Sequence, residues 1–432
     1  MTNRTGFVRW LSVLGILTAF SSANAADWSR FRGPNGSAVS DARGVPTEWS
    51  TSTNLAWKTP LPGPGSSSPI IVGDRVFVTC YSGYGTSRGA AGDIKQLQRH
   101  LICVSLKDGL ILWDKAVAAK QPEDSFNGYL RDHGYATSTP TSDGESVFVF
   151  FGKSGVLAFD LDGKQLWQSP VGSGSGKNGW GSGSSPIVYR GTVIVNASAE
   201  AKSLIAFDKK TGKEAWRSNA DNIHGSWATP VLVDAPNGKT ELVVSAPYEL
   251  WGFDPDNGDF LWFGEGVQDD TICGSVVARD GIVYAVGGRS GSAVAVKAGG
   301  RDDVSKSHVI WKKSLRSYVP SPVLAGDHVL SVNNDGGIFS CLDAKTGEQL
   351  FQQRLNSAGS VYASPVVVDG KAYVVTRRSG TFVVNLSDKV EVIAENKLDD
   401  DTDFNASPAV TDGKLLLRSN RALYCISNKS QK

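Results

Sequence analysis

Two of the five histidines stand in loops that also carry aromatic and charged residues, which makes these loops the first candidates for chemistry. His133 belongs to the stretch 126–135, and His224 belongs to the stretch 223–227. His133 follows Asp132, a combination that acid–base catalysis uses, but neighbouring side chains of an extended segment point to opposite sides. We therefore predict a ligand-binding role for these loops and assign no catalytic residue.

The other candidate residues come from loops at equivalent positions of a repeated unit. Each loop precedes the first strand of a unit or follows its second strand, so all of them open on one loop-rich face. Polar and aromatic groups that converge on one mouth suit a small-molecule or peptide pocket. For any single residue the alternative is a hydrogen bond between neighbouring units. The ligand-binding candidates are Arg131, Asp132, His133, Lys153, Trp180, His224, Trp227, Tyr248, Asp270, Arg289, Arg377 and Arg378.

The acidic run 399–401 offers the hard oxygen ligands that calcium prefers. It lacks the spacing of any defined calcium loop, so a solvated acidic loop is the preferred interpretation and no metal site is predicted.

The cysteines favour structural roles. The third strands of three units carry a cysteine at the position where other units carry Ala or Gly: Cys103, Cys341 and Cys425. These cysteines are expected to fill this position as small apolar residues. Cys80 lies in the strand next to Cys103 and is its one plausible disulfide partner, although free thiols are preferred. Cys273, near the mouth, remains as an odd thiol.

The elements that position these loops recur along the chain. In residues 184–216 a Ser-x-Pro start, three apolar strands, a Thr-Gly turn and a fourth strand ending in Trp216 follow one another. Alternating apolar residues bounded by Gly, Asp and Asn are typical of strands and hairpins. Most copies are roughly 40 to 50 residues apart, the first being lengthened by an insertion at 81–99. The eight first strands begin at Ser68, Thr139, Ser185, Thr229, Ser275, Ser321, Ser364 and Ser407.

Four antiparallel strands at this period predict an all-β fold, an eight-bladed β-propeller spanning residues 54–432. The last unit has only three strands, whereas residues 54–58 around Trp57 resemble a fourth strand without a blade of its own. This N-terminal strand is expected to complete blade eight and close the ring, which also removes an exposed strand edge. The structural tryptophans of the fourth strands are Trp57, Trp113, Trp167, Trp216, Trp262 and Trp311.

Residues 1–25 have the pattern of a signal peptide: Arg4 and Arg9 precede a short apolar run and an Ala-x-Ala site. The mature chain is therefore expected to be exported, periplasmic or secreted, without a transmembrane segment. It is also expected to lack a lipid anchor, because no Cys follows the leader. Residues 26–53 are expected to lie extended against the propeller. The formal net charge of +1 gives no indication of nucleic-acid binding, and a monomer is expected.

The Ser-x-Pro start, the Ala-Phe-Asp-x-x-Thr-Gly turn of residues 206–212 and the terminal Trp216 together resemble the pyrroloquinoline-quinone (PQQ) repeat of quinoprotein-dehydrogenase-like propellers. The resemblance covers about residues 55–426. The family it implies includes dehydrogenases and non-catalytic propellers such as the outer-membrane protein assembly factor B type. Catalytic members hold PQQ between a tryptophan floor and an adjacent Cys-Cys disulfide, with a bridging calcium ion.

This sequence contains no Cys-Cys pair, no haem-attachment motif and no identifiable calcium-ligand set of that family. The sequence therefore favours an interaction scaffold that binds an unknown protein or small molecule at the propeller mouth, with no catalytic residues and no cofactor assigned. The alternative is a divergent PQQ-dependent dehydrogenase of alcohols or sugars, which would carry PQQ and calcium.

Overall fold

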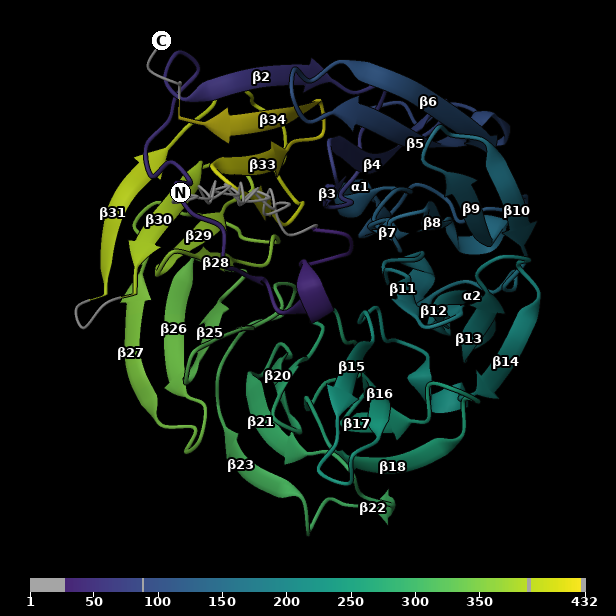
Figure 1. The fold of residues 1–432 in the computed structure, drawn as a ribbon, viewed down its shortest axis with the longest axis vertical. Coiled ribbons are helices and arrows are strands. Elements are labelled where there is room, and N and C mark those ends of the chain that lie inside the picture. The colour runs from purple at the N-terminus through teal and green to yellow at the C-terminus, as the bar shows by residue number, and fades with distance from the viewer. Residues whose placement is uncertain (1–27, 88, 387–389, 429–432) are drawn as a thin grey trace, which may run out of the picture.

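The computed structural model describes residues 28–87, 89–386 and 390–428. Eight blades stand around a central channel, each with four antiparallel strands that follow one another outward from the channel (Figure 1). In two of these sheets a fifth, short strand adds in parallel. The predicted eight-bladed β-propeller is therefore confirmed. The predicted signal peptide, residues 1–25, lies outside the described residues. Among those residues, no helix is both long enough and apolar enough to cross a membrane.

The blades follow the chain in order. Blade one contains β3 (Ile70–Val72), β4 (Arg75–Ser82), β5 (Gln98–Ser105) and β6 (Ile111–Ala118), and blade two contains β7 (Thr141–Ser142), β8 (Ser146–Phe150), β9 (Val156–Asp160) and β10 (Gln165–Ser169). Blade three contains β11 (Ile187–Tyr189), β12 (Thr192–Ala197), β13 (Ser203–Asp208) and β14 (Glu214–Asn219). Blade four contains β15 (Val231–Asp234), β16 (Thr240–Ala246), β17 (Glu249–Phe253) and β18 (Phe260–Glu265), with β22 (Asp302–Asp303) at its outer edge.

Blade five contains β19 (Val277–Arg279), β20 (Ile282–Gly287), β21 (Ser292–Lys297) and β23 (Val309–Lys313). Blade six contains β24 (Val323–Ala325), β25 (His328–Val332), β26 (Ile338–Asp343) and β27 (Gln349–Arg354). Blade seven contains β28 (Val366–Val368), β29 (Lys371–Val375), β30 (Thr381–Asn385) and β31 (Glu391–Asn396), and blade eight contains β32 (Ala409–Thr411), β33 (Lys414–Arg418), β34 (Ala422–Ser427) and β2 (Leu55–Pro60). The two short α-helices are α1 (Leu130–His133) and α2 (Ser198–Ala201).

The N-terminal strand closes the ring as predicted. β2 pairs antiparallel with β34, and Trp57 stands opposite Cys425 in the register. The last blade thus takes three strands from the C-terminal end and one from the N-terminal end, so no unpaired edge remains at the junction (Figure 1).

The fourth-strand tryptophans join neighbouring blades. The indole N–H of Trp57 donates to the Leu106 carbonyl at 3.2 Å, and that of Trp216 donates to the Pro255 carbonyl at 3.1 Å. Each ring covers a glycine of the next blade: a Cβ on Gly109 would lie 2.7 Å from the Trp57 ring. Trp113, Trp167 and Trp311 repeat this arrangement, whereas Trp262 donates to Glu241 within its own blade.

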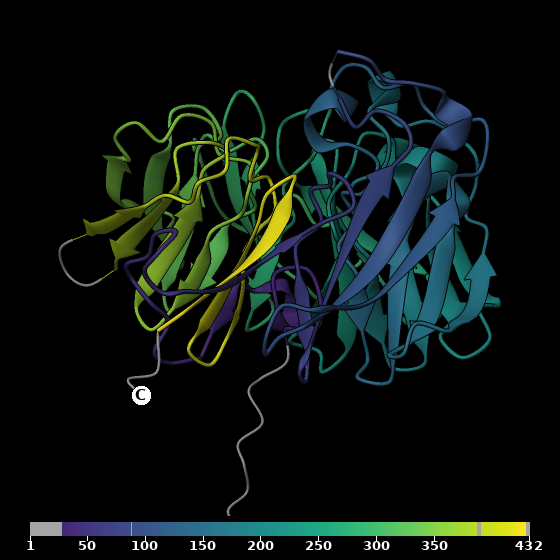
Figure 2. The ribbon, with the colours of Figure 1, turned by 90° about the horizontal axis from the view of Figure 1, so that it is seen from above.

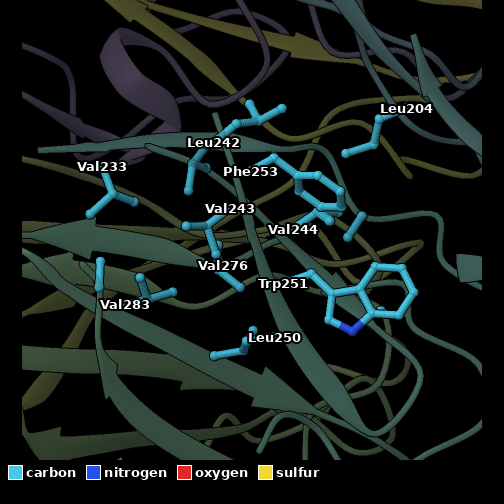
Figure 3. Packing of buried hydrophobic residues seen from close by; sticks show 14 of the residues in the cluster. Leu204, Val233, Leu242, Val243, Val244, Leu250, Trp251, Phe253, Val276 and Val283 are labelled. Carbon is cyan, nitrogen blue, oxygen red and sulfur yellow. The ribbon is translucent and has the colours of Figure 1, made fainter. Parts of the chain in front are cut away.

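Apolar side chains of adjacent sheets fill the space between the blades. The largest core cluster joins blades three, four and five, with Leu242, Val244 and Phe253 buried at its centre (Figure 3). Blade seven carries Ala394 where other blades carry the aromatic ring. Trp49 from the N-terminal segment packs beside it and stacks on Tyr373 at 6.3 Å between ring centroids.

The N-terminal segment crosses the channel. Trp28 bridges to Ile71 of blade one, and the short 3-10 helix η1 (Pro34–Gly36) lies in the middle of the ring (Figure 1). β1 (Val39–Ser40) then adds to β28 of blade seven in parallel. Figure 2 shows this purple segment between the blades, below the loops that rise from blade one.

All five cysteines are free thiols, so the disulfide considered between Cys80 and Cys103 is not formed. Their strands are adjacent, but Cys80 stands opposite His100, three positions from Cys103. Because successive side chains of a strand point to opposite faces, the two thiols lie on opposite sides of the sheet. Cys103, Cys341 and Cys425 stand opposite Trp113, Phe351 and Trp57, in the slot where Ala206 faces Trp216.

Candidate functional site

A cavity of about 160 Å³ opens where the long loops converge at the mouth of the channel. We call it the channel pocket. Its base is formed by the Ser or Thr residue that stands just before the first strand of each blade, and its wall by aromatic side chains from several blades. Its lining includes Phe31, Tyr129, Asp132, His133, Trp180, Trp227, Cys273, Tyr318, Tyr362 and Asn405, together with the eight residues Ser68, Thr139, Ser185, Thr229, Ser275, Ser321, Ser364 and Ser407.

The eight hydroxyl residues form a closed hydrogen-bonded ring. The backbone N–H of each donates to the hydroxyl oxygen of its counterpart in the next blade, from Ser68 to Thr139 and finally from Ser407 back to Ser68, at 2.9–3.0 Å. The hydroxyl residue at the start of each unit, which directly precedes Pro in seven of the eight, thus supplies both the donor and the acceptor of this bond. Since each oxygen here acts as an acceptor, its own O–H can still be donated toward the channel.

The N-terminal segment closes the base of the pocket. Phe31 contributes to the lining, and the residues on either side of it reach beneath the ring. Arg30 donates to the Pro230 carbonyl at 3.1 Å, and Arg32 donates to the Pro322 carbonyl. Burial lowers the pKa of Arg30 to about 10 and, together with the charge of Arg30, that of Arg32 to about 9. The floor is therefore apolar at its surface with positive charge beneath it.

The upper wall is a set of aromatic rings. Trp180 packs edge-on against Tyr129 at 4.5 Å and lies 5.3 Å from Trp227, between ring centroids. On the other side Arg289 lies 4.4 Å from the centroid of Tyr318, and Arg377 lies 4.3 Å from that of Tyr362. These cation–π contacts help to fix the two tyrosine rings, which line the cavity.

His133 is held by hydrogen bonds through both ring nitrogens. Nδ1 lies 2.7 Å from the Thr137 hydroxyl, and Nε2 lies 3.0 Å from the Trp180 carbonyl, to which it must donate. Burial lowers the pKa of His133. A neutral imidazole whose Nε2–H is committed to a carbonyl is suited to positioning α1 and the Trp180 loop rather than to transferring a proton.

The charges around the pocket compensate one another. Arg377 pairs with Asp132 at 3.3 Å and with Asp403 at 2.8 Å, and its Nε donates to Asn405. Arg289 pairs with Asp269 at 3.2 Å and donates to the Tyr318 hydroxyl at 2.6 Å. The Arg377 network ties blades two, seven and eight together, and the Arg289 network ties the loops before and after blade five to that blade.

Four of the predicted candidates line the channel pocket: Asp132, His133, Trp180 and Trp227. Arg289 and Arg377 lie outside its lining but contact the lining rings of Tyr318 and Tyr362. The remaining candidates lie outside its lining and bond elsewhere on the loop-rich face: Arg131 to Phe126, Lys153 to Asp124, His224 to Ser175, Asp270 to Lys177 and Arg378 to Asp403, while Tyr248 is exposed. The ligand-binding role of all twelve stays a prediction.

Several lining residues escaped the sequence analysis. Tyr318 stands three positions before Ser321 and Tyr362 two positions before Ser364, so both lie at the channel end of a loop. Phe31 is one of three large aromatic residues that favour packing of residues 26–53 against the propeller, but without a repeat the sequence gives no indication that it lines the pocket. Cys273 does lie at the mouth, but burial raises the pKa of its thiol to about 12, which disfavours the reactive thiolate.

The lining does not fit PQQ with calcium as the catalytic members hold it. Among the described lining residues Cys273 is the single thiol and Asp132 the single carboxylate, and Asp132 is paired with Arg377. The acidic run 399–401 is also engaged: Asp400 accepts from the Ser419 and Tyr424 hydroxyls, and Asp401 pairs with Arg421. No group of three or more His, Cys, Asp and Glu side chains in the described ranges is arranged to hold a metal ion.

Known proteins resemble this chain in sequence and in fold. A family model described as outer membrane protein assembly factor BamB matches residues 4–180, 98–340 and 306–425. The protein of that name from Burkholderia pseudomallei (strain K96243) is 25% identical over 377 residues, which are 81% of this chain and 85% of the relative.

Two solved structures share the propeller. BamB from Moraxella catarrhalis superposes with a TM-score of 0.60 at 14% identity, covering 86% of this chain and 99% of that one. A europium-containing methanol dehydrogenase gives a TM-score of 0.61 at 12% identity, covering 91% of this chain and 89% of that one. At such identities the likeness shows the fold alone. Because the family model matches most of the sequence, the chain belongs to the BamB-type family of PQQ-repeat β-propellers.

Proposed function

We propose that this chain is an exported scaffold that binds a segment of a partner protein in the channel pocket of its loop-rich face. The observation that carries the proposal is the composition of the accessible wall. Trp180, Trp227, Tyr318 and Tyr362 present rings to the cavity, while the charged side chains behind them are engaged with one another. Tyrosine and tryptophan dominate protein-binding surfaces because they supply large contact areas at low entropic cost.

The shape of the pocket also supports a peptide segment as its occupant. A cavity of about 160 Å³ has room for one or two side chains, and the hydroxyl ring at its base offers hydrogen-bond donors to a polar tip. The long loops around the mouth can contact the rest of the segment. His133 is committed to structural bonds, so the lining gives this pocket no acid–base pair.

The curated relative and the leader support the proposed export of the chain and its contact with a partner protein. The curated relative is named an outer membrane protein assembly factor, which is a role in contact with other proteins. Residues 1–25 have the composition of a secretory leader. Export to the periplasm or beyond would bring the loop-rich face into contact with such partners.

Peptide display on the purified chain tests the proposal. Selected peptides should bind the wild-type protein, and Tyr362→Ala should weaken them by tenfold or more because it removes one wall of the pocket. Phe260→Ala is the control: this exposed ring stands on the outer strand β18, outside the lining and outside the candidate residues, and its loss should leave affinity unchanged. Equal affinity of both variants would place the binding surface elsewhere. Stoichiometric binding of PQQ with calcium, accompanied by dye-linked alcohol oxidation, would favour the dehydrogenase instead.

A further inference from the structure

Three side chains on blade one have the arrangement of a nucleophile, a base and an orienting carboxylate. The hydroxyl of Ser82 lies 2.8 Å from Nε2 of His100, and Nδ1 of His100 lies 2.9 Å from a carboxylate oxygen of Asp114. Such a chain of two hydrogen bonds, with the base between nucleophile and carboxylate, is the geometry that activates serine in acyl transfer. The three residues lie outside the lining of the channel pocket.

The register of three adjacent strands produces this arrangement. Ser82 ends β4, His100 stands in β5 opposite Cys80, and Asp114 stands in β6 opposite Ile102. The three positions therefore follow a diagonal across one face of the sheet, on which every second residue of a strand projects. Cys80 and Ile102, buried on that face, pack in the core shared with blade eight, which places the triad at the rim of this interface.

The hydrogen bonds define the protonation state. An ionised Asp114 can only accept, so Nδ1 of His100 carries the proton and donates it to the carboxylate. Nε2 then holds the free lone pair and accepts the hydrogen bond from Ser82. This tautomer is the one in which imidazole acts as a general base toward a serine hydroxyl.

The site combines a fixed base with an accessible nucleophile. The side chain of His100 is 8% exposed and that of Asp114 is 33% exposed. Ser82 is half-buried at the end of its strand, and Ala116 and Ala118, on the same face of β6, are exposed and small. Gln98, directly opposite Ser82, adds an amide donor to that face.

We propose that Ser82, His100 and Asp114 form a second site that hydrolyses small, unhindered esters. In acylation Ser82 Oγ bonds to the ester carbonyl carbon, its proton moves to His100 Nε2, and that proton passes to the departing alkoxide as the C–O bond breaks. In deacylation the oxygen of a water bonds to the acyl carbon and gives its proton to Nε2. The acyl–serine bond then breaks, the acid leaves, and the proton returns to Ser82. Asp114 acts as a positioning residue that holds the imidazole.

Labelling of the full chain with a fluorophosphonate probe, with the labelled residues mapped by mass spectrometry, tests whether Ser82 is an activated nucleophile. Ser82 should label at least tenfold faster than Ser427, a matched control that also ends a strand, is half-buried and bonds to the backbone carbonyl of Asn428. His100→Gln should slow the labelling of Ser82 by at least tenfold, since a positioned base contributes roughly 100-fold. Ser82→Ala, which changes an accessible strand end, should abolish turnover of p-nitrophenyl acetate at an unchanged melting temperature.

Asp114→Asn separates positioning from structure. The proton magnetic resonance of the His100 Nδ1–H, which a carboxylate partner shifts downfield, should move upfield in this variant while labelling of Ser82 slows. Labelling of Ser82 at less than ten times the rate of Ser427, or labelling that His100→Gln slows by less than tenfold, would overturn the proposal. Either result would mean that the three residues form only a structural hydrogen-bond network at the rim of blade one.

Discussion

Trp57→Ala is the sharpest test of how the ring is held closed. The indole is 9% exposed, covers Gly109 of blade one and donates to the Leu106 carbonyl at 3.2 Å. Truncating a buried tryptophan to alanine costs about 3–5 kcal/mol, which includes the lost hydrogen bond and the cavity that remains. Because β2 is joined to β34 of its blade only along one edge, the lost anchor should also loosen the closing strand.

Trp216→Ala is the matched control. It is 8% exposed, covers Gly258 and donates to the Pro255 carbonyl. Its strand β14 is also outermost in its blade but is joined to β13 by a hairpin, whereas no hairpin joins β2 to β34. Urea unfolding should give a similar loss of free energy of unfolding for both variants. Hydrogen exchange should show lost amide protection in β2 and β34 for Trp57→Ala alone. A cost below about 1 kcal/mol for Trp57→Ala, or unchanged protection of β2, would refute the argument that this strand closes the ring through its tryptophan.

Three further outcomes follow from buried groups. Gly109→Ala should lower the free energy of unfolding by at least about 1 kcal/mol more than Gly413→Ala. Both glycines have positive φ, but only at Gly109 would the added Cβ clash with the Trp57 ring. Equal losses of free energy in urea unfolding would contradict this. Burial raises the pKa of Glu200 from 4.5 to about 7, so the folded state favours its neutral form, and stability should fall by about 3 kcal/mol as pH rises from about 4.5 to 7. In Glu200→Gln this fall of stability with rising pH should disappear. If the stabilities of the variant and the wild type instead change with pH in parallel, Glu200 does not cause the fall. Cys341→Ala should cost about 1 kcal/mol or less in the same assay, because alanine fills this slot in other blades; failure to fold would contradict the shared slot.

The architecture was predictable from the sequence because its signals are local and repeated. Seven of the eight units start on a Ser-Pro or Thr-Pro pair, and five carry a glycine four residues before the aromatic ring of the fourth strand, so a misread unit is corrected by the others. The closing strand was predictable for a related reason: Trp57 has the fourth-strand pattern, and the last unit lacks a fourth strand. The position of Cys341 was predictable from the alignment of the third strands, and the structure places it opposite the aromatic ring of Phe351 in the fourth strand.

The candidate site was predictable in its location but less so in its composition. The order of the strands places His133, Trp180 and Trp227 at one mouth, because loops of the same type open on the same face of every blade. His224 and Tyr248 belong to such loops too, yet they lie outside the lining. The path of a long loop depends on what it packs against, and the repeat carries no information about those contacts.

Only the tertiary structure decides what residues without repeat character do. The segment with Phe31 crosses the channel because contacts with several blades capture it, not because of its own propensity. His100 looks ordinary in sequence, and its bonds to Ser82 and Asp114 exist because strand register sets these residues on one diagonal. The sequence by itself determines the repeated strands and their closure, since these depend on neighbouring residues. The pocket floor and the triad depend on which distant side chains the closed ring brings within bonding distance.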